Sequence, residues 1–413
     1  MPATPQPVPT ILMVLLLFVT QACTDIFLPG LPHIAEEFNS SIDVASLTIS
    51  VYNYCQAAVV LFIGVVSDVR GRRPTIMLCF GLHILATIAI ALCSSMPVMI
   101  AMRAVQALGS AAVYIVLRMI IKDTLDKKAQ IHATGLLVIG LVLSPILAPV
   151  VGSWIVHWSN WRYCFWALCV LDLPLFAWAW IAIGETNLRR DHFKATFSWA
   201  THARNYREVV ADPYFRGMAL IVGAAFAAFY AFISISSFMF IHQFHMRETT
   251  YGYVFIALAL SYLAGNRLMS ALNARTLAPQ RIIAIGLWVS VAGAACVLAG
   301  PWFAPAALAL MAIVVGTCLL RLATALIIPP AQVEVTNHFP QHGAHALGLL
   351  TCTQYCFAAI GTMVVSNLWF SPSMNFLVST VLFVALSALG YGVVARRAAL
   401  TPTGDTSRTI HRP

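Results

Sequence analysis

The sequence predicts an all-α membrane protein with twelve transmembrane helices, arranged as two halves of six. Three observations predict this fold class: a very apolar composition, apolar runs that recur along the chain, and one long polar break near the middle. Of the 413 residues, 60% are hydrophobic and only 9% are charged, whereas a soluble domain carries about 25% charged residues. Most of the surface therefore cannot face water.

A transmembrane helix needs about 20 mostly apolar residues to cross about 30 Å of hydrocarbon. The first half of the chain has such runs at 11–33, 44–66, 74–94, 97–118, 131–155 and 162–183. The second half has them at 215–241, 251–273, 281–300, 303–328, 342–368 and 374–395. We interpret the first run as a retained span, because it lacks the basic start of a signal peptide.

These runs divide the chain into five segments. We expect a short N-terminus, a six-helix half, a polar linker, a second six-helix half and a disordered polar tail, at 1–10, 11–183, 184–214, 215–395 and 396–413. Within the linker, apolar residues interrupt the polar ones from Ala195 to Ala211, which favours a surface helix there.

The basic residues predict the orientation in the membrane. If both termini are cytoplasmic, the cytoplasmic loops, the span ends next to them and the tail hold 20 of the 24 Lys and Arg, and the opposite side holds two, Arg162 and Arg247. Cytoplasmic loops of membrane proteins carry such an excess of Lys and Arg. The formal net charge of +9 is therefore a topology signal, and we expect no nucleic-acid partner.

No cofactor or metal site is expected. The ten cysteines lie mostly inside apolar runs and lack CxxC spacing, so they indicate neither a disulfide framework nor a zinc site. The histidines His338, His342 and His345 have spacings that resemble a metal site, but an exposed loop with incidental histidines is the favoured interpretation.

The most distinctive local pattern follows the second apolar run. Residues 64–74 read GVVSDVRGRRP. Gly64 permits close helix approach, Gly71 permits a tight turn, and Pro74 suits the first position of the next helix. Arg72 and Arg73 add positive charge. Asp68 is expected at the cytoplasmic end of the second span, where it can pair with an arginine or meet a helix N-terminus.

This pattern resembles the loop between helices 2 and 3 of the major facilitator superfamily. Three further segments resemble motifs of that superfamily and of its Bcr/CflA branch of proton-coupled drug exporters: TDIFLPGLP at 24–32, RAVQALGSAA at 103–112 and SPILAPVVGSW at 144–154. The last contains Pro145, Pro149 and Gly152 and resembles the helix-5 antiporter motif. The resemblance implies the major facilitator fold, proton coupling and export, with the coupling acid at the position of Asp25.

Asp25, Arg103, Asp172 and Arg321 are charged residues inside the apolar runs. A charge in hydrocarbon costs at least about 2.5–3.5 kcal/mol, so each needs a compensating role. We predict that Asp25 carries the coupled proton and that Arg103 tunes it. Asp172 is expected to cap or bridge helices locally. For Arg321 two readings stay open: it reaches the cytoplasmic face, or it adds positive charge to the cavity, where it would favour anionic or zwitterionic substrates.

A substrate cavity is expected between the halves, because large apolar pockets with a few polar groups bind amphipathic small molecules. Its candidate residues are polar or aromatic side chains within the spans. They are Gln21, Tyr52, Asn53, Gln56, Gln106, Ser110, Phe229, Tyr230, Gln354 and Tyr355.

Together these patterns predict a monomeric, multi-pass protein of the inner membrane that exports small amphipathic compounds in exchange for protons. The antiport direction and the proton come from the resemblance, whereas the buried acid and base come from the residues. Dedicated export of one metabolite, such as a siderophore, nucleoside or amino-acid derivative, is the alternative, and nutrient uptake a more remote one. An intramembrane enzyme is disfavoured because the spans hold no nucleophile–base or HExxH pattern, and the sequence has no Walker-type phosphate loop for direct use of ATP.

Overall fold

The structure is a computed structural model that describes residues 8–187, 198–300 and 306–400. Throughout these residues the chain is helical and contains no strand. It has twelve segments long and apolar enough to cross a membrane. The fold class predicted from the sequence is therefore confirmed.

The first half begins with an interrupted span. Helix α1 (Thr10–Asp25) ends at the acidic residue, a short 3-10 turn η1 (Leu28–Gly30) follows, and α2 (Leu31–Glu37) completes the crossing. The other five spans are α3 (Ile42–Arg70), α4 (Arg72–Leu92), α5 (Met96–Thr124), α6 (Lys127–Trp158) and α7 (Arg162–Ala182).

The second half follows a linker that contains α9 (Trp199–Ala211). Its first span is α10 (Pro213–Ser237) continued by a π-helical turn η2 (Phe238–Gln243). The remaining spans are α11 (Glu248–Ala274), α12 (Pro279–Ala299), α13 (Ala306–His338), α14 (Gly343–Ser366) and α15 (Pro372–Leu400).

Several helices are longer than the apolar runs that predicted them. Helix α3 extends to Arg70, α5 to Thr124 and α13 to His338, because a helix continues into the polar interface after its apolar residues end. The expected loop at 64–74 is therefore mostly helical and breaks only at Gly71. Arg72 is the first residue of α4, so the expectation that Pro74 stands there is wrong by two residues.

Some expectations fall on residues outside those described. They include residues 1–7 of the N-terminus, 188–197 of the linker and 401–413 of the expected disordered tail. The surface helix expected from Ala195 to Ala211 can be compared only from residue 198 onward, where α9 begins at Trp199.

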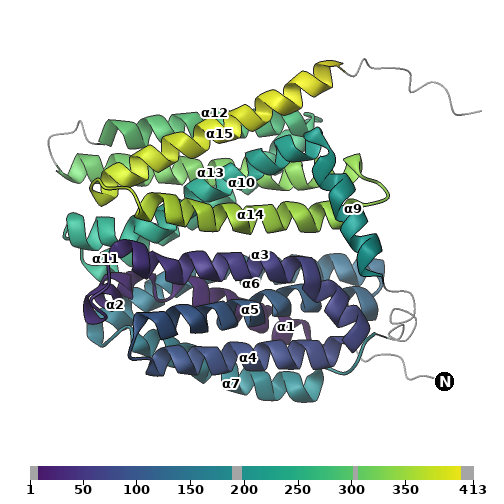
Figure 1. Cartoon of the computed structure of the whole chain (residues 1–413), viewed down its shortest axis with the longest axis horizontal. Coiled ribbons are helices and arrows are strands. Elements are labelled where there is room, and N and C mark those ends of the chain that lie inside the picture. The colour runs from purple at the N-terminus through teal and green to yellow at the C-terminus, as the bar shows by residue number, and fades with distance from the viewer. Residues whose placement is uncertain (1–7, 188–197, 301–305, 401–413) are drawn as a thin grey trace, which may run out of the picture.

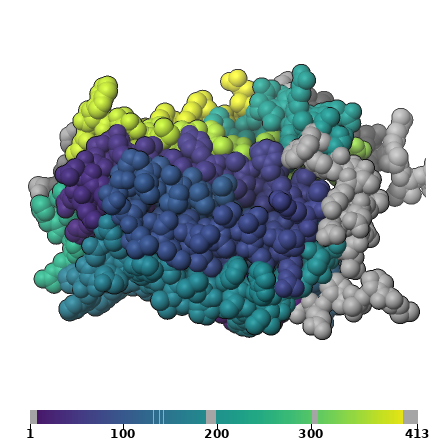
Figure 2. Space-filling model, turned by 60° about the horizontal axis from the view of Figure 1, so that its bottom comes forward, coloured from purple at the N-terminus to yellow at the C-terminus, as the bar shows by residue number. Residues whose placement is uncertain are grey.

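The two halves lie side by side, with α3 and α14 running along each other between them (Figure 1). Helices α6 and α11 also pack across the boundary between the halves. Viewed toward the first half, α14 follows the upper edge of α3 (Figure 2). We call the end of the molecule that carries α9 the linker end, and the end that carries α2 and η2 the far end (Figure 1).

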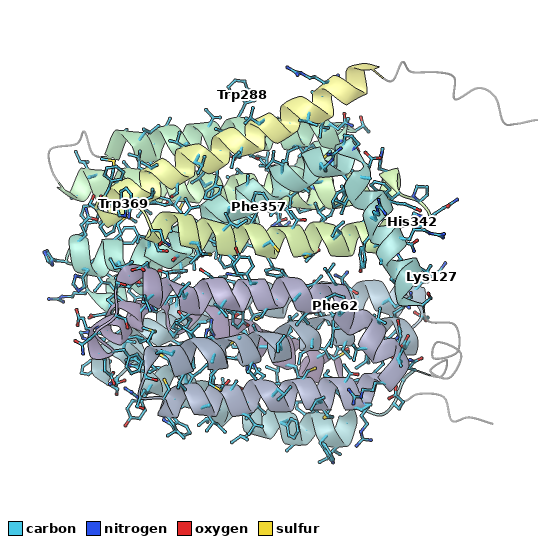
Figure 3. The ribbon with its side chains drawn as sticks, in the orientation of Figure 1. Phe62, Lys127, Trp288, His342, Phe357 and Trp369 are labelled. Atoms are coloured by element: carbon cyan, nitrogen blue, oxygen red, sulfur yellow. The ribbon has the colours of Figure 1, made fainter. Side chains whose placement is uncertain are left out.

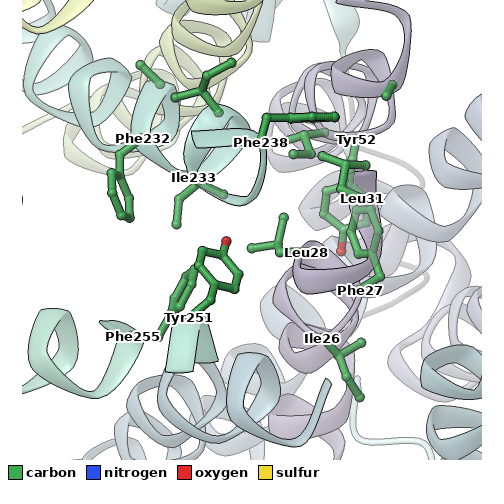
Figure 4. Packing of buried hydrophobic residues seen from close by; sticks show 14 of the residues in the cluster. Ile26, Phe27, Leu28, Leu31, Tyr52, Phe232, Ile233, Phe238, Tyr251 and Phe255 are labelled. Carbon is green, nitrogen blue, oxygen red and sulfur yellow. The ribbon is translucent and has the colours of Figure 1, made fainter. Parts of the chain in front are cut away.

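The far end is closed by apolar side chains from both halves. Leu28 of the first half points toward Tyr251 and Ile233 of the second (Figure 4), and all three side chains are less than 5% exposed. The same cluster contains Phe27, Leu31, Phe232, Phe238 and Phe255. This packing excludes water from the boundary between the halves at the far end.

The outer surface carries exposed tryptophans, and basic side chains lie at one end of the molecule. Trp288 points away from the bundle and is 75% exposed, and Trp369 at the far end is 97% exposed (Figure 3). Lys127 and His342 lie at the opposite end (Figure 3). Trp and Tyr are enriched at both interfaces of membrane proteins, whereas Lys and Arg concentrate in the cytoplasmic loops.

Glycines allow the closest helix contacts. A Cβ atom built on Gly361 of α14 would lie 2.9 Å from the backbone carbonyl carbon of Ala227 in α10, and real Cβ atoms do not approach backbone so closely. A Cβ on Gly348 of the same helix would meet nothing within 4 Å. Small residues let transmembrane backbones approach in this way.

We therefore predict that Gly361→Ala lowers the free energy of unfolding by about 1–3 kcal/mol, because overpacking forces α10 and α14 apart. Thermal unfolding of the purified protein in detergent measures the effect. Gly348→Ala on the same helix is the matched control and should be neutral or slightly stabilising, because alanine favours the helix. Equal destabilisation by both substitutions would contradict the packing role.

Candidate functional site

Asp25 lies just past the middle of the first span, where α1 ends. Its side chain is partly exposed, although its neighbours Ile26 and Phe27 are buried. Among the described residues it has no ion-pair partner within 4.0 Å. The chain leaves regular helix directly after it, so this carboxyl stands at the break of an interrupted transmembrane helix.

Arg103 of α5 is almost completely buried, at 1% exposure. Its guanidinium donates to the backbone carbonyls of Cys23 at 3.0 Å and Thr48 at 3.3 Å, and to the Gln106 side chain. It lies 4.2 Å from the ring centroid of Tyr52 and 4.5 Å from that of Phe27, within the range of cation–π interactions. Arg103 is thus bonded to α1 and α3.

Several predicted cavity residues belong to the same buried network. The Tyr52 hydroxyl lies 2.5 Å from Ser110 Oγ, and Gln106 Nε2 donates to Thr87 Oγ1 at 2.8 Å. These contacts join α3, α4 and α5 inside the first half. Tyr52, Gln106 and Ser110 are at most 2% exposed, so in this conformation they support Arg103 from within the half.

The remaining predicted cavity residues are less closely grouped. Asn53 donates to the backbone of its own helix, at Ile49, and Gln56 is 2% exposed. Gln21 is partly exposed one turn before Asp25. In the second half, Gln354 is 7% exposed.

Aromatic side chains line the second half opposite Asp25. Tyr230 of α10 packs against Phe226 and Phe229, with ring centroids 5.0 and 5.9 Å apart. Tyr355 of α14 meets the same Phe226 edge-on at 6.1 Å. The aromatic candidates of the second half therefore form one continuous group.

Arg321 of α13 joins this aromatic group. Its guanidinium carbon lies 4.0 Å from the ring centroid of Phe229 and 4.3 Å from that of Tyr262 in α11. Of the two readings left open by the sequence, the structure supports a central position, because the residue lies near the midpoint of α13 and its side chain does not reach the helix end. Tyr262 was missed, because nothing in the sequence marks it as a neighbour of Arg321.

Charged residues of the two halves interact electrostatically near Asp25. Arg321 and Arg103 are the two cations whose charges act on Asp25, and Tyr230 lies within the same electrostatic group. These four residues come from α1, α5, α10 and α13. Asp25 and Arg321 thus interact across the boundary between the halves, and Arg103 acts on Asp25 from within the first half.

Asp172 has a partner that the sequence did not reveal. Its carboxylate lies 3.4 Å from His83 Nε2, and both side chains are fully buried. The contact bridges α7 and α4, which agrees with the local structural role expected for Asp172. Its partner could not be inferred because His83 lies far away in the sequence.

Arg72 organises the loop motif at the linker end. Its guanidinium contacts Asp68 at 2.7 Å and Asp123, just before the end of α5, at 2.9 Å. Its backbone N–H donates to Glu185 Oε1 at 2.9 Å. Gly71 has φ of 106°, a left-handed value that favours glycine, and a Cβ there would overlap the Glu185 carboxylate.

The neighbouring Arg73 contacts a different helix, α7. It donates to the backbone carbonyl of Trp180 in α7 at 3.0 Å. Gly64 is close to Met119 of α5, where a Cβ would lie 3.1 Å from the methyl carbon. The motif therefore ties α3 and α4 to α5 and α7 within the first half.

The helix-5 motif lies where α6 crosses two other spans. Helix α6 continues through Pro145 and Pro149. A Cβ on Gly152 would overlap the backbone carbonyl of Ile26, directly after the acidic residue of α1. A Cβ on Gly252 of α11, in the other half, would overlap the side chain of the next residue, Ser153.

Histidine–carboxylate contacts connect the halves at the far end. Glu248 of the second half lies 3.5 Å from His33 and 3.4 Å from His157, both of the first half. In a third contact the histidine belongs to the second half and the carboxylate to the first: His242 of η2 lies 2.8 Å from Glu36 of α2. These polar contacts surround the apolar closure described above.

At the linker end, α9 contacts both halves. The Tyr206 hydroxyl donates to the carbonyl of Leu61 in α3 at 3.3 Å. His202 Nδ1 lies 3.0 Å from His345 Nε2 in α14, and Glu208 lies 3.4 Å from His342. No group of three or more possible metal ligands is found among the described side chains.

The family model of the Major Facilitator Superfamily matches residues 13–362. The chain belongs to this superfamily. Three solved structures with its fold align with TM-scores of 0.70–0.71: a D-xylose-proton symporter, a bacterial homologue of the lysosomal transporter Spinster in an inward-facing conformation, and the nucleoside transporter NupG. They cover 93–96% of this chain at 13–16% sequence identity, and 96–99% of their own chains.

Curated relatives within the superfamily are more similar in sequence. The multidrug transporter MdfA of Yersinia pestis is 27% identical over 271 residues, which are 65% of each chain. The multidrug resistance protein MdtL of Escherichia coli is 32% identical over 171 residues, 41% of this chain and 44% of the relative. The chain thus spans less than two thirds of the length of the curated relatives it matches.

We predict that Arg72→Met lowers the free energy of unfolding by about 1–3 kcal/mol, because it leaves Asp68 and Asp123 without their partner. The midpoint of thermal unfolding in detergent reports the change. Arg70→Met, which removes an exposed arginine two residues earlier, is the matched control and should shift the midpoint little. The role assigned to Arg72 is wrong if the two variants unfold at the same temperature.

Proposed function

We propose that the protein is a proton-coupled antiporter of the Bcr/CflA type, which exports small amphipathic compounds across the inner membrane by alternating access. The observation that carries the proposal is Asp25: a partly exposed carboxyl near mid-membrane, at a break in its helix, without an ion-pair partner among the described residues. The names of the relatives MdfA and MdtL support export of many compounds over export of a single metabolite.

An ionisable residue at this depth is costly and is a functional-site candidate by default. Asp25 is suited to carry a proton because two conditions meet there. First, it is not neutralised by a fixed salt bridge, so its charge can change without breaking one. Second, Arg321 and Arg103 act on it electrostatically, so loss or gain of its proton changes the interaction between the two halves.

Alternating access follows from the way the halves are joined. In this conformation the far end is closed by the Leu28–Tyr251 packing and by the histidine–carboxylate contacts around it. We assign the linker end to the cytoplasm, because basic residues concentrate in the loops there. The outward-open state would separate the far-end contacts while the two halves rock about the central site.

The cycle uses the proton gradient as its energy source and needs no cofactor. Protonation of Asp25 from the outside removes its charge, and release of the proton to the cytoplasm restores the carboxylate. Export of the substrate occurs on the alternate half of the cycle, when Asp25 is ionised. We propose that a single chain suffices, because both halves and the central charges belong to it.

We predict that Asp25→Asn abolishes efflux that a protonophore inhibits, because asparagine cannot exchange a proton. Efflux of a panel of fluorescent amphipathic compounds from cells, with and without a protonophore, measures this. Membrane insertion should be unchanged, since the substituted side chain is similar in size and carries no charge into the membrane.

Asp43→Asn is the matched control, because it removes a partly exposed carboxyl at the far end, in the first turn of α3. It should leave protonophore-sensitive efflux within about twofold of wild type, since a carboxyl at a helix start contributes only about 0.3–1 kcal/mol. Unchanged active efflux in Asp25→Asn would remove this carboxyl from the coupling mechanism.

A further inference from the structure

Arg321 is a cation in the middle of the membrane whose counter-charge is not supplied by a salt bridge. It lies near the midpoint of α13, where a charged side chain facing lipid is strongly unfavourable. Its guanidinium is instead held between the rings of Phe229 and Tyr262. The side chain is partly exposed, so the two rings do not enclose it completely.

The hydrogen-bond donors of Arg321 are also unused. Among the described residues its side chain has no carboxylate within 4.0 Å and no hydrogen-bond acceptor. Arg103 is the opposite case, because three of its contacts are to carbonyl or amide oxygens and it is 1% exposed. Of the two central arginines, Arg321 is the one whose donors are free to bind a ligand.

The charges around it define what that ligand should carry. Asp25 is the carboxylate whose charge acts on Arg321; it belongs to the first half, stands at the break after α1 and has no ion-pair partner among the described residues. Two guanidiniums and one carboxylate leave an excess of positive charge, which disfavours a purely cationic substrate. A purely anionic substrate would satisfy Arg321 but would be repelled by ionised Asp25.

We propose that the central site selects zwitterionic amphipathic compounds, with their carboxylate bound by Arg321 and their amine at Asp25. This inference rests on the proposed function and specifies its substrate class. The amine and the proton then compete for the same carboxyl, which is the exchange that an antiporter requires. The aromatic group of Phe226, Phe229 and Tyr230 provides an apolar surface for the body of the substrate.

The planar guanidinium suits this task because it binds a carboxylate through two parallel hydrogen bonds. The rings of Phe229 and Tyr262 hold its plane without occupying its donors. A lysine at this position would keep the positive charge but could not donate two parallel hydrogen bonds to one carboxylate. Arg321 is thus proposed as a specificity-determining residue, and Phe229 and Tyr262 as positioning residues.

The test uses the whole protein in proteoliposomes with an imposed pH gradient and three matched probes. They are a zwitterionic arylpiperazine carboxylic acid such as norfloxacin, its ethyl ester, which is only cationic, and its N-acetyl derivative, which is only anionic. Wild type should transport the zwitterion with a kcat/KM about tenfold or more above either derivative, since hydrogen bonds between charged groups are worth that much.

Arg321→Gln should lower kcat/KM for the zwitterion about tenfold, to the level of the ester, and leave the ester within about twofold. Arg321→Lys should recover part of the preference. Arg281→Gln, which removes an exposed arginine at the start of α12, is the control and should transport all three probes like wild type. Tyr262→Leu should weaken the preference without removing the charge.

Two results overturn the inference while leaving the proposed function intact. One is a wild type that transports all three probes equally, and the other is an Arg321→Gln variant that loses zwitterion and ester transport to the same degree. If Arg321→Gln does not fold, an unchanged preference in both Arg321→Lys and Tyr262→Leu overturns it. A wild type that moves none of a broad panel of amphipathic compounds under a pH gradient contradicts the proposed function itself.

Discussion

The structure depends on one constraint: a charge near the centre of a bilayer must be compensated by the protein. Arg103 meets this constraint with carbonyl oxygens and aromatic rings of its own half. Asp25 and Arg321 meet it only partly, because each is partly exposed and acts on the other from a different half. The charge of Arg103 is thus compensated within one half, whereas Asp25 and Arg321 interact across the boundary between the halves.

The fold was accessible from the sequence because the bilayer imposes a length on every span. Runs such as 74–94 and 281–300 predicted α4 and α12 closely, since their apolar residues fill the whole helix. Prediction was poorer where helices continue into the interface. Asp68 was expected in a loop and lies in α3, because a hydropathy pattern marks the apolar part of a helix and not its hydrogen-bonded end.

The site was only partly accessible for a different reason. Burial cost singled out Asp25, Arg103, Asp172 and Arg321, and the family resemblance implied the role of Asp25; in the structure Arg103 and Arg321 both act on Asp25. Which side chain each one meets depends on contacts between distant segments. The positions of Tyr262 beside Arg321 and of Glu185 beside Gly71 follow from helix packing that no local pattern encodes.

The linker helix α9 has a consequence for how far the halves can move. It contacts Leu61 of the first half through Tyr206, and it contacts α14 of the second half through His202 and Glu208. Rotation of one half against the other must therefore carry α9 with one side and slide it over the other, or bend the chain next to it. The described part of the linker thus couples the two halves at this end of the molecule, so a change in their relative position must break or replace at least one of these contacts.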